Sequence, residues 1–597
     1  MDAALYNRAT SGGGSQQCRQ LAQRRPADGV GHRHRLADTL LHLFAWGICS
    51  ANAIQRLAQA AQDDGLRYPE LDDIAALGTH GEYAGNCRRD LVRKLQRGLE
   101  LPKPLKVDVR AQDRHEKEHQ VAYDVLPLAG IVETMYRNHI DKFNDFFGTA
   151  RVRAFWDSVD PRDPKLLRMR DITSRDGWKD RCIPYTIHGD GAVYAHTNEE
   201  SVLSIQIKSL LSGEFAGHML PLFVLPKGGR LVERGYDTAD ELWRAAIHQL
   251  NSLYDGIHAP ADHTGAPWEH PRMAELAGSP VCMGRWLWIC WIVGGDLEFL
   301  SNELKFPHFN SLDPCWLCPA SRRPDAPHSV VDCRRVATFK AHLAISLVPQ
   351  SGHVFTTIKA ITRFHSPGDL QHTGDLGVAG YMLGSTLWDL VYDGPFTGTI
   401  EERRSELWKM ITDEYDLQRS DSRLGSLTLS MFHTPGQFPY LKGRASENQR
   451  LLFVVAEVCR QMSDGSERDG HRLRALDSLC AFYRGLKDAG MFLTPAEHAM
   501  ALRTVEVFLL NYNWLTAHAL ARDRLNYSLA FKHHALWHIA HMSQWINPCS
   551  HWSYEFEDFM GQIVASTRNC MHGTPLHRVG CKVMENYLLA LHLYLRD

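Results

Sequence analysis

Residues 182–191 read Cys-Ile-Pro-Tyr-Thr-Ile-His-Gly-Asp-Gly, and this stretch decides the fold. The run is short and β-prone and ends at Asp190 between two glycines, which predicts a strand that closes on an acid. Glycine lets the backbone bend sharply and lets a phosphate or a metal ion come close. An aspartate beside glycine is also a common turn residue, so Asp190 gains a functional meaning only together with other acids.

The segments that follow predict two more strands, a helix and a fourth strand. Strands are expected over 201–211 and 218–225, and the second is stopped by Pro-Lys-Gly-Gly at 226–229. Thr238 to Ile257 carries apolar residues at helical spacing, with Thr238 or Asp240 as its cap. Val281 to Val293 is rich in Trp, Ile and Cys, which predicts a fully buried strand that ends just before a second acid, Asp296.

A third acid lies far along the chain, in a segment with helical spacing. Its apolar face is formed by Phe556, Phe559, Met560 and Ile563. Glu557 lies at the edge of this face, and we prefer it as the third acid, with Glu555 and Asp558 as open alternatives. Three converging carboxylates suffice to hold a pair of Mg²⁺ ions about 3.5–4 Å apart, which activate an attacking oxygen and stabilise the leaving one.

These stretches resemble the landmarks of a known family. In chain order the landmarks are His188–Gly191, Trp291–Leu297, the Cys-x-x-Cys at 315–318, Asp369-Leu370-Gln371-His372 and Leu441–Ala445. Together they resemble DDE transposases of the CACTA (En/Spm) type, with the closest likeness to the transposon-like proteins of dinoflagellates. The resemblance spans about Ile183 to Leu595, and its specificity comes from the order of the motifs.

The resemblance implies an α/β fold, a ribonuclease H-like mixed sheet with a large helical insertion. It implies that Asp190, Asp296 and Glu557 are catalytic and bind Mg²⁺, and that Asp369 and His372 form a signature between the second and third acids. The implied activity is DNA cleavage and strand transfer in the nucleus, on transposon terminal repeats and target DNA, with a homodimer as the assembly to test. Two alternatives stay open: a decayed or domesticated DNA-binding protein with the same fold, and another ribonuclease H-like nuclease.

The chain divides into five expected parts. They are a disordered basic tail (1–36), a helical N-terminal region (37–165), the first part of the core with the Cys-x-x-Cys segment (166–390), a helical insertion (391–531) and a C-terminal helical part that carries the third acid (532–597). Within the insertion, helix-period apolar residues predict helices over Leu451–Met462, Leu473–Ala489 and Pro495–Ala519, the last capped by Thr494.

Cys315 and Cys318 have the spacing of half a tetrahedral Zn²⁺ site. Pro314 and Pro319 bracket the pair, which favours a tight knuckle-like turn. The candidates for the remaining ligands are His308, His328, Cys333 and His372. The alternative is that both cysteines are buried small hydrophobic residues.

A second group of histidines follows at 533–541. His534, His538 and His541 fall on one helical face, after Lys532 and His533. We predict a polar helix face that touches solvent, phosphate or a carboxylate, in preference to a metal site. The zinc hydrolase pattern, with a glutamate after the first histidine, is absent.

Composition sets outer limits on these predictions. A chain of 597 residues that is 44% hydrophobic and 10% aromatic is typical of a folded protein with several domains or one core with an insertion. A net charge of −3 argues against a strongly basic nucleic-acid-binding domain, although basic residues gather at 165–181, before the first acid. Fourteen cysteines without regular spacing fit a reducing compartment, and the apolar run 281–293 is too short to span a bilayer.

Overall fold

The computed structural model describes residues 35–96, 98–195, 200–213, 218–326, 329–330 and 347–596. The expected disordered tail over 1–36 lies outside these residues, apart from its last two positions, which begin the first described helix. In the described part of the chain, none of the helices has the length and apolar character that crossing a membrane requires.

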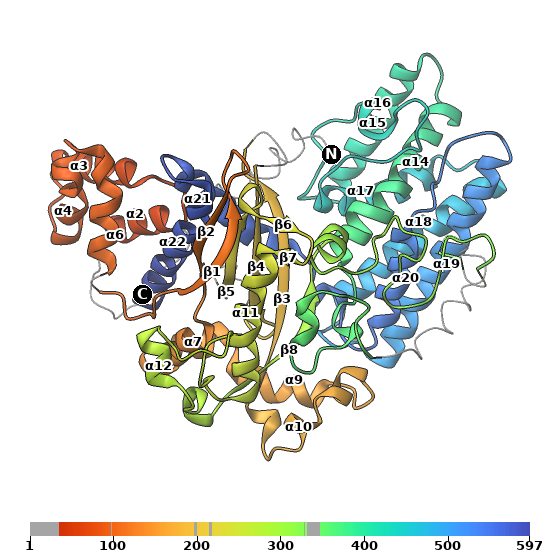
Figure 1. Cartoon of the computed structure of the whole chain (residues 1–597). Helices are drawn as coiled ribbons and strands as arrows, with labels where there is room; N and C mark the ends of the chain where they lie inside the picture. Colours follow the sequence, from red (N-terminus) through yellow and green to blue (C-terminus); the bar gives the residue numbers. More distant parts are fainter. Residues whose placement is uncertain are drawn as a thin grey trace.

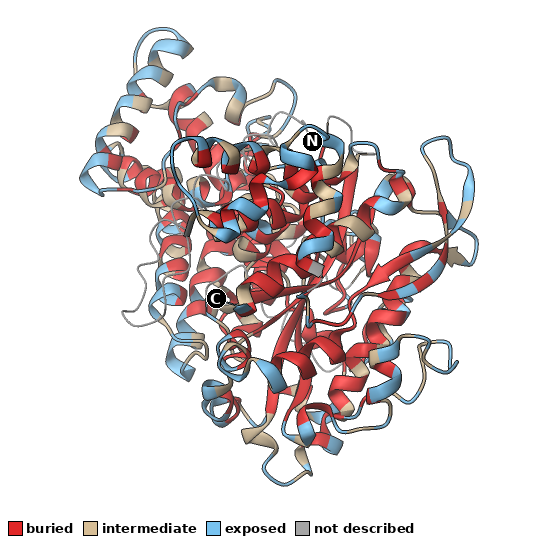
Figure 2. Cartoon of the chain, turned by 90° about the vertical axis from the view of Figure 1, so that its left-hand side faces the viewer, coloured by how far each residue is buried: buried red, intermediate tan, exposed pale blue. Residues whose placement is uncertain are grey.

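A four-stranded mixed sheet lies at the centre of the α/β fold (Figure 1). Its strands are β3 (Cys182–Val193), β4 (Ser201–Ser209), β5 (Met219–Pro226) and β8 (Leu287–Gly294). The spatial order is β5-β4-β3-β8, with β3 antiparallel to β4, β4 antiparallel to β5, and β3 parallel to β8. All residues of β4 and β5 are buried, and Figure 2 shows these strands in red through the middle of the molecule.

The predicted strands and the helix between them are confirmed, with shifted ends. The helix α11 spans Thr238–Asp255, and its N-cap is Asp237, whose side chain accepts a hydrogen bond from the Ala239 amide, in place of the expected Thr238 or Asp240. The expected strand over 281–293 begins only at Leu287, because Val281–Gly284 forms a short turn with Gly284 at a φ of 75°.

The register of the parallel pair places Asp190 and Asp296 at corresponding positions, where the pairing of β3 with β8 ends. His188 pairs with Gly294, and each is followed two residues later by an acid, Asp190 and Asp296 respectively. Parallel strands have their C-terminal ends on the same side of the sheet. Asp296 follows β8, but Asp190 lies within β3, which continues to Val193 paired with β4, so the prediction of a strand that ends at Asp190 is wrong.

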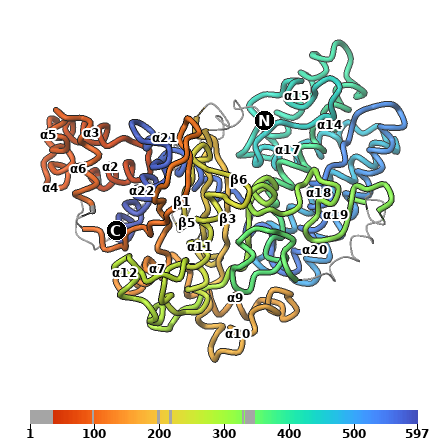
Figure 3. The backbone as a smooth tube through the Cα atoms, viewed as in Figure 1, coloured from red at the N-terminus to blue at the C-terminus, as the bar shows by residue number. Residues whose placement is uncertain are grey.

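Helices cover both faces of the sheet. On one face, Trp243 of α11 packs edge-on against Phe223 of β5. On the other face lie α21 (Tyr554–Met571) and α22 (Leu576–Arg596), where the Tyr587 hydroxyl donates to the Met219 carbonyl oxygen at 2.7 Å. Figure 3 shows α22 running beside the red N-terminal helices, with which Leu589 and Leu593 share an apolar core.

The N-terminal region is not purely helical, contrary to the expectation for 37–165. Its helices are α2 (Arg35–Ala45), α3 (Ala51–Asp63), α4 (Pro69–Ala75), α5 (Leu77–His80), α6 (Cys87–Gln96), α7 (Leu128–Asn138), α8 (Ile140–Phe147) and α9 (Val152–Ser158). Between α6 and α7 lies an antiparallel pair, β1 (Leu105–Gln112) and β2 (Glu118–Val125). The alternation of buried and exposed residues along β1 is the period of two that a half-buried strand requires.

A second apolar core belongs to the helical insertion. Its helices are α14 (Ala379–Asp393), α15 (Ile400–Leu417), α16 (Leu429–Phe432), α17 (Ala445–Gln461), α18 (Glu467–Asp488) and α19 (Pro495–Leu520), followed by α20 (Phe531–Met542). Leu383 and Leu387 of α14 belong to this core, so it starts upstream of position 391. The predicted helices of the insertion are confirmed, including the Thr494 cap, which forms a capping box with Glu497.

Candidate functional site

Asp190 and Asp296 accept hydrogen bonds from backbone amides just beyond the last paired residues of β3 and β8. The Gly191 amide donates to Asp190 Oδ1 at 2.7 Å, and the Phe299 amide donates to Asp296 Oδ1 at 2.6 Å. Gly189 and Gly295 flank this edge, and a Cβ at either position would meet the Phe299 ring at 2.0 and 2.3 Å. The glycines are therefore needed for the close packing that brings the two strand ends together.

The two aspartates and Glu557 lie within electrostatic range of one another. Burial, with the charges of Asp296 and Glu557, raises the pKa of Asp190 to about 7, although the charge of His372 opposes the rise. A carboxyl group with a raised pKa beside two other acids is the arrangement that a bound cation stabilises. Asp296 and Glu557 are therefore near enough to Asp190 for their charges to act on it.

Of the three neighbouring acids at 555–558, Glu557 is the one that faces this place. Glu555 forms an ion pair with Lys208 of β4. Glu557 accepts a hydrogen bond from the Gln371 side-chain amide at 2.6 Å and lies 3.5 Å from His372 Nε2. Burial and the charge of Glu555 raise the pKa of Asp558. The geometry thus distinguishes candidates that the sequence left open.

Asp369 and His372 lie beside the acids at the start of a π-helix, η12 (Gln371–Val378). Asp369 Oδ2 is 2.6 Å from His372 Nδ1, and Asp369 Oδ1 accepts from the Ser553 amide at 3.1 Å. Burial opposes protonation of His372, but the hydrogen bond and charge of Asp369, with the charges of Glu557 and Asp296, raise the pKa of His372 to about 10. His372 is therefore a cation among carboxylates at neutral pH.

His188 fixes α21 on the sheet. Its ring stacks on Phe556 with the ring centres 4.2 Å apart, and His188 Nε2 lies 3.1 Å from the Ser553 hydroxyl. Burial lowers the pKa of His188 to about 3, so the ring is neutral at physiological pH. Because His188 and Asp190 are two residues apart on one strand, they lie on the same face, and this stacking sets the position of Glu557 relative to Asp190.

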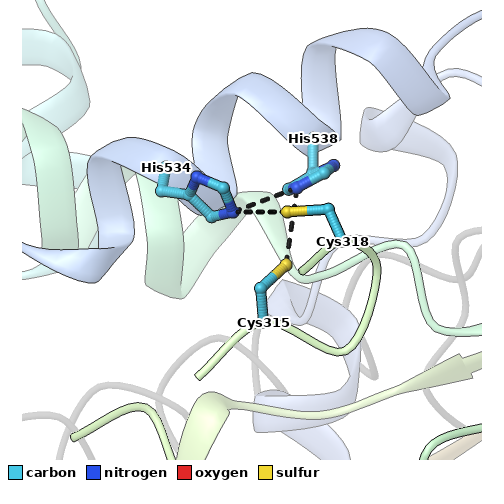
Figure 4. A group of neighbouring side chains, drawn as sticks. All are labelled: Cys315, Cys318, His534 and His538. Atoms are coloured by element: carbon cyan, nitrogen blue, oxygen red, sulfur yellow. Dashed lines mark hydrogen bonds between the residues drawn. The ribbon is translucent and has the colours of Figure 1, made fainter. Parts of the chain in front are cut away.

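A buried Cys2His2 cluster forms a second site (Figure 4). It consists of Cys315, Cys318, His534 and His538, whose ligand atoms all lie within 4.8 Å of one another. Cys315 Sγ is 3.4 Å from His538 Nε2, Cys318 Sγ is 3.4 Å from His534 Nε2, and the two Nε2 atoms are 3.1 Å apart. These four residues can hold a metal ion such as zinc.

The donor set fits zinc in both chemistry and spacing. Tetrahedral Zn²⁺ with bonds of about 2.3 Å to sulfur and about 2.0–2.1 Å to nitrogen separates sulfur and nitrogen ligands by roughly 3.5 Å and two nitrogens by roughly 3.3 Å. Hydrogen bonds from Cys315 and from both histidines hold the pKa of Cys318 well below its usual value, whereas burial and the adjacent Cys318 raise that of Cys315. One thiolate is thus favoured before any metal binds.

The remaining ligands are not the ones that the sequence suggested. His308 is exposed and stacks on Phe309, and His372 belongs to the acid site. His328 and Cys333 lie outside the described residues. The expectation of a solvated polar face on the helix over 531–542 is wrong for His534 and His538, which are buried against the cysteine turn.

The signal that could have identified these histidines was their own spacing. Two histidines at i and i+4 lie on one helical face and are a common zinc-binding pair. No pattern in the sequence indicates that this helix packs against a turn 216 residues upstream, a contact that the structure shows between Cys318 and His534. Comparison of the chain with protein-family models and with curated proteins finds no match.

Proposed function

We propose that this protein is a metal-dependent DNA nuclease and strand-transfer enzyme of the DDE transposase type, built on a ribonuclease H-like core. The proposal is carried by two observations: Asp190 and Asp296 come two residues after the paired residues His188 and Gly294 of the parallel strands β3 and β8, and the charges of Asp296 and Glu557 both act on Asp190. The strand order β5-β4-β3-β8, with the long helix α11 between β5 and β8 in the chain, supports the same core.

The three carboxylates fit Mg²⁺ in kind and number. Mg²⁺ binds through a few carboxylates and retains several waters, and two such ions activate the attacking oxygen and stabilise the leaving oxygen in phosphoryl transfer. Asp190, Asp296 and Glu557 would hold the ions. His372, held by Asp369, balances part of the negative charge and orients Glu557.

Lys532 supplies a positive charge on the Asp296 side of the site. It is the second residue of α20; burial lowers the pKa of its ammonium group, and the charges of Asp296, Asp369 and Glu298 oppose that shift. The Cys2His2 cluster attaches α20 to the segment that follows β8, so it also fixes Lys532. We assign a structural Zn²⁺ to this cluster and a DNA-phosphate contact to Lys532.

The test compares variants of two proposed metal ligands, Asp190 and Glu557, with a variant of the neighbouring acid Asp558. Full-length protein is incubated with supercoiled plasmid DNA and Mg²⁺ or Mn²⁺, and nicked product is measured. Asp190→Asn and Glu557→Gln are expected to lower the rate on the order of 10²-fold or more, the scale of one lost electrostatic contact to a transition state. Asp558→Asn, one residue further on the same helix, is the matched control and should stay close to wild type.

Two controls separate chemistry from folding and binding. DNA binding with Ca²⁺ and the thermal melting curve should be nearly unchanged in all three variants. Cleavage that survives in Asp190→Asn would show that the activity belongs to another site or another protein. Wild-type protein that binds DNA without any metal-dependent cleavage would favour the decayed, DNA-binding alternative.

A further inference from the structure

The side chain of Gln371 makes the shortest contact to Glu557. Gln371 is 1% exposed, and its amide nitrogen donates to Glu557 Oε1 at 2.6 Å, whereas His372 Nε2 is 3.5 Å from the same oxygen. Among the described residues, Gln371 Oε1 is buried and accepts no hydrogen bond. A buried side-chain amide loses stability when its oxygen has no hydrogen bond, so the bond from its nitrogen to Glu557 is the interaction that accounts for its position.

Glu557 needs an external restraint. Its side chain is 41% exposed, so packing alone leaves it several rotamers, and a carboxylate that ligates a metal must be held in one. The other two acids accept hydrogen bonds from backbone amides within one to three residues of themselves. Gln371 supplies the corresponding restraint for Glu557 from a different part of the chain.

The segment that carries Gln371 also fixes the first turn of α21. Asp369 accepts from the Ser553 amide, and Asp375 Oδ2 accepts from the Tyr554 hydroxyl at 2.7 Å. The backbone amide of Gln371 donates to Asp369 Oδ1 at 3.3 Å. Three residues of the 369–375 segment therefore contact three residues at the start of α21, and two of the three, Gln371 and Asp375, lie in the π-helix. Single π-turns of this kind are frequent at functional sites.

We propose that Gln371 is a positioning residue for the third acid, which holds Glu557 in the orientation that shares a divalent cation with Asp190 and Asp296. This inference rests on the proposed function. Partners that hold a ligating carboxylate typically account for a 10–100-fold effect on metal affinity or activity when they are removed. Gln371 lies between the two residues of the Asp369–His372 signature and acts through Glu557 rather than on DNA.

The test is a Mn²⁺ titration of Gln371→Met, which keeps the length of the side chain and removes the donor. The Mn²⁺ concentration at half-maximal nicking is expected to rise roughly 10–100-fold, with much of the rate recovered at saturating Mn²⁺. Direct Mn²⁺ binding, measured by electron paramagnetic resonance, should weaken to the same extent. Gln418→Met is the matched control, because Gln418 donates to the Glu414 carboxylate at 2.8 Å in α15, away from the acids.

The outcomes separate this inference from the proposed function. If Asp190→Asn loses Mn²⁺ binding and cleavage while Gln371→Met titrates like wild type, the positioning role is refuted and the proposed function stands. If the wild-type protein binds no Mn²⁺, both are refuted. Zinc content and the melting curve report whether Gln371→Met folds; if it does not, Gln371→Asn, whose shorter amide cannot reach Glu557 at the same distance, replaces it with the same expected direction.

Discussion

Replacing Cys315 with serine removes one ligand from the buried cluster that joins two distant parts of the chain. The cluster closes a loop between Cys318 and His534, which are 216 residues apart. In the chain-entropy treatment of a cross-link, a loop of that length corresponds to roughly 5 kcal/mol of stability. For a cooperative unit of about 150–250 residues, 1 kcal/mol shifts Tm by about 2–4 °C, so loss of the metal should lower Tm by ~10 °C or more.

The assay is elemental analysis combined with thermal melting, on protein purified without chelator. We expect about one zinc per wild-type chain, little zinc in Cys315→Ser and in His538→Asn, and a lower Tm for both variants and for wild type treated with a strong chelator. Hydrogen exchange should speed up in α20 and in the turn around Cys315, because these are the two segments that the metal joins.

The matched control is Cys459→Ser. Cys459 is fully buried in α17 and lies outside the cluster, so the Cys459→Ser protein should keep its zinc and lose at most the roughly 1–3 kcal/mol that burying a hydroxyl costs. Wild-type protein without zinc, or a Cys315→Ser variant that keeps zinc and melts like wild type, would refute the assignment and return both cysteines of the turn to apolar packing.

Three further predictions concern the packing around the acids. Because burial lowers the pKa of His188 to about 3, stability should be full above pH 6.5 and fall at up to ~1.4 kcal/mol per pH unit as the pH drops toward 3; His188→Gln should reduce this slope in urea titrations at pH 5 and 7. Gly189→Ala should destabilise the protein by ~1–3 kcal/mol, since its Cβ would meet the Phe299 ring at 2.0 Å, and an unchanged urea midpoint would contradict that packing. Gly561→Ala, in the middle of α21 with no atom within 4 Å of the new Cβ, should stabilise by ~0.5–1 kcal/mol, and a lower midpoint would contradict the open space seen there.

Local sequence patterns predicted most of the elements that position the acid site. The β-prone run ending at Asp190, the apolar run ending before Asp296 and the helical period after Thr238 each depend on neighbouring residues, so they can be recognised without the rest of the chain. The caps at Thr494 and Pro495 are equally local. The strands β1 and β2 show that such a signal can also be overlooked, because β1 alternates apolar and polar residues as clearly as any strand in the chain.

Contacts between distant segments were decided only by the tertiary structure. Cys315 and His538 meet because α20 packs against the turn after β8, and no periodicity in either segment encodes that meeting. Glu557 differs from Glu555 because one faces Gln371 and the other Lys208, which depends on how α21 rotates against the sheet. By itself, the sequence determined which residues have the chemistry to bind metals and which runs form strands, because these are properties of single residues and short runs. The tertiary structure decided which of them share a site, because side chains hundreds of residues apart converge only when the whole chain has packed.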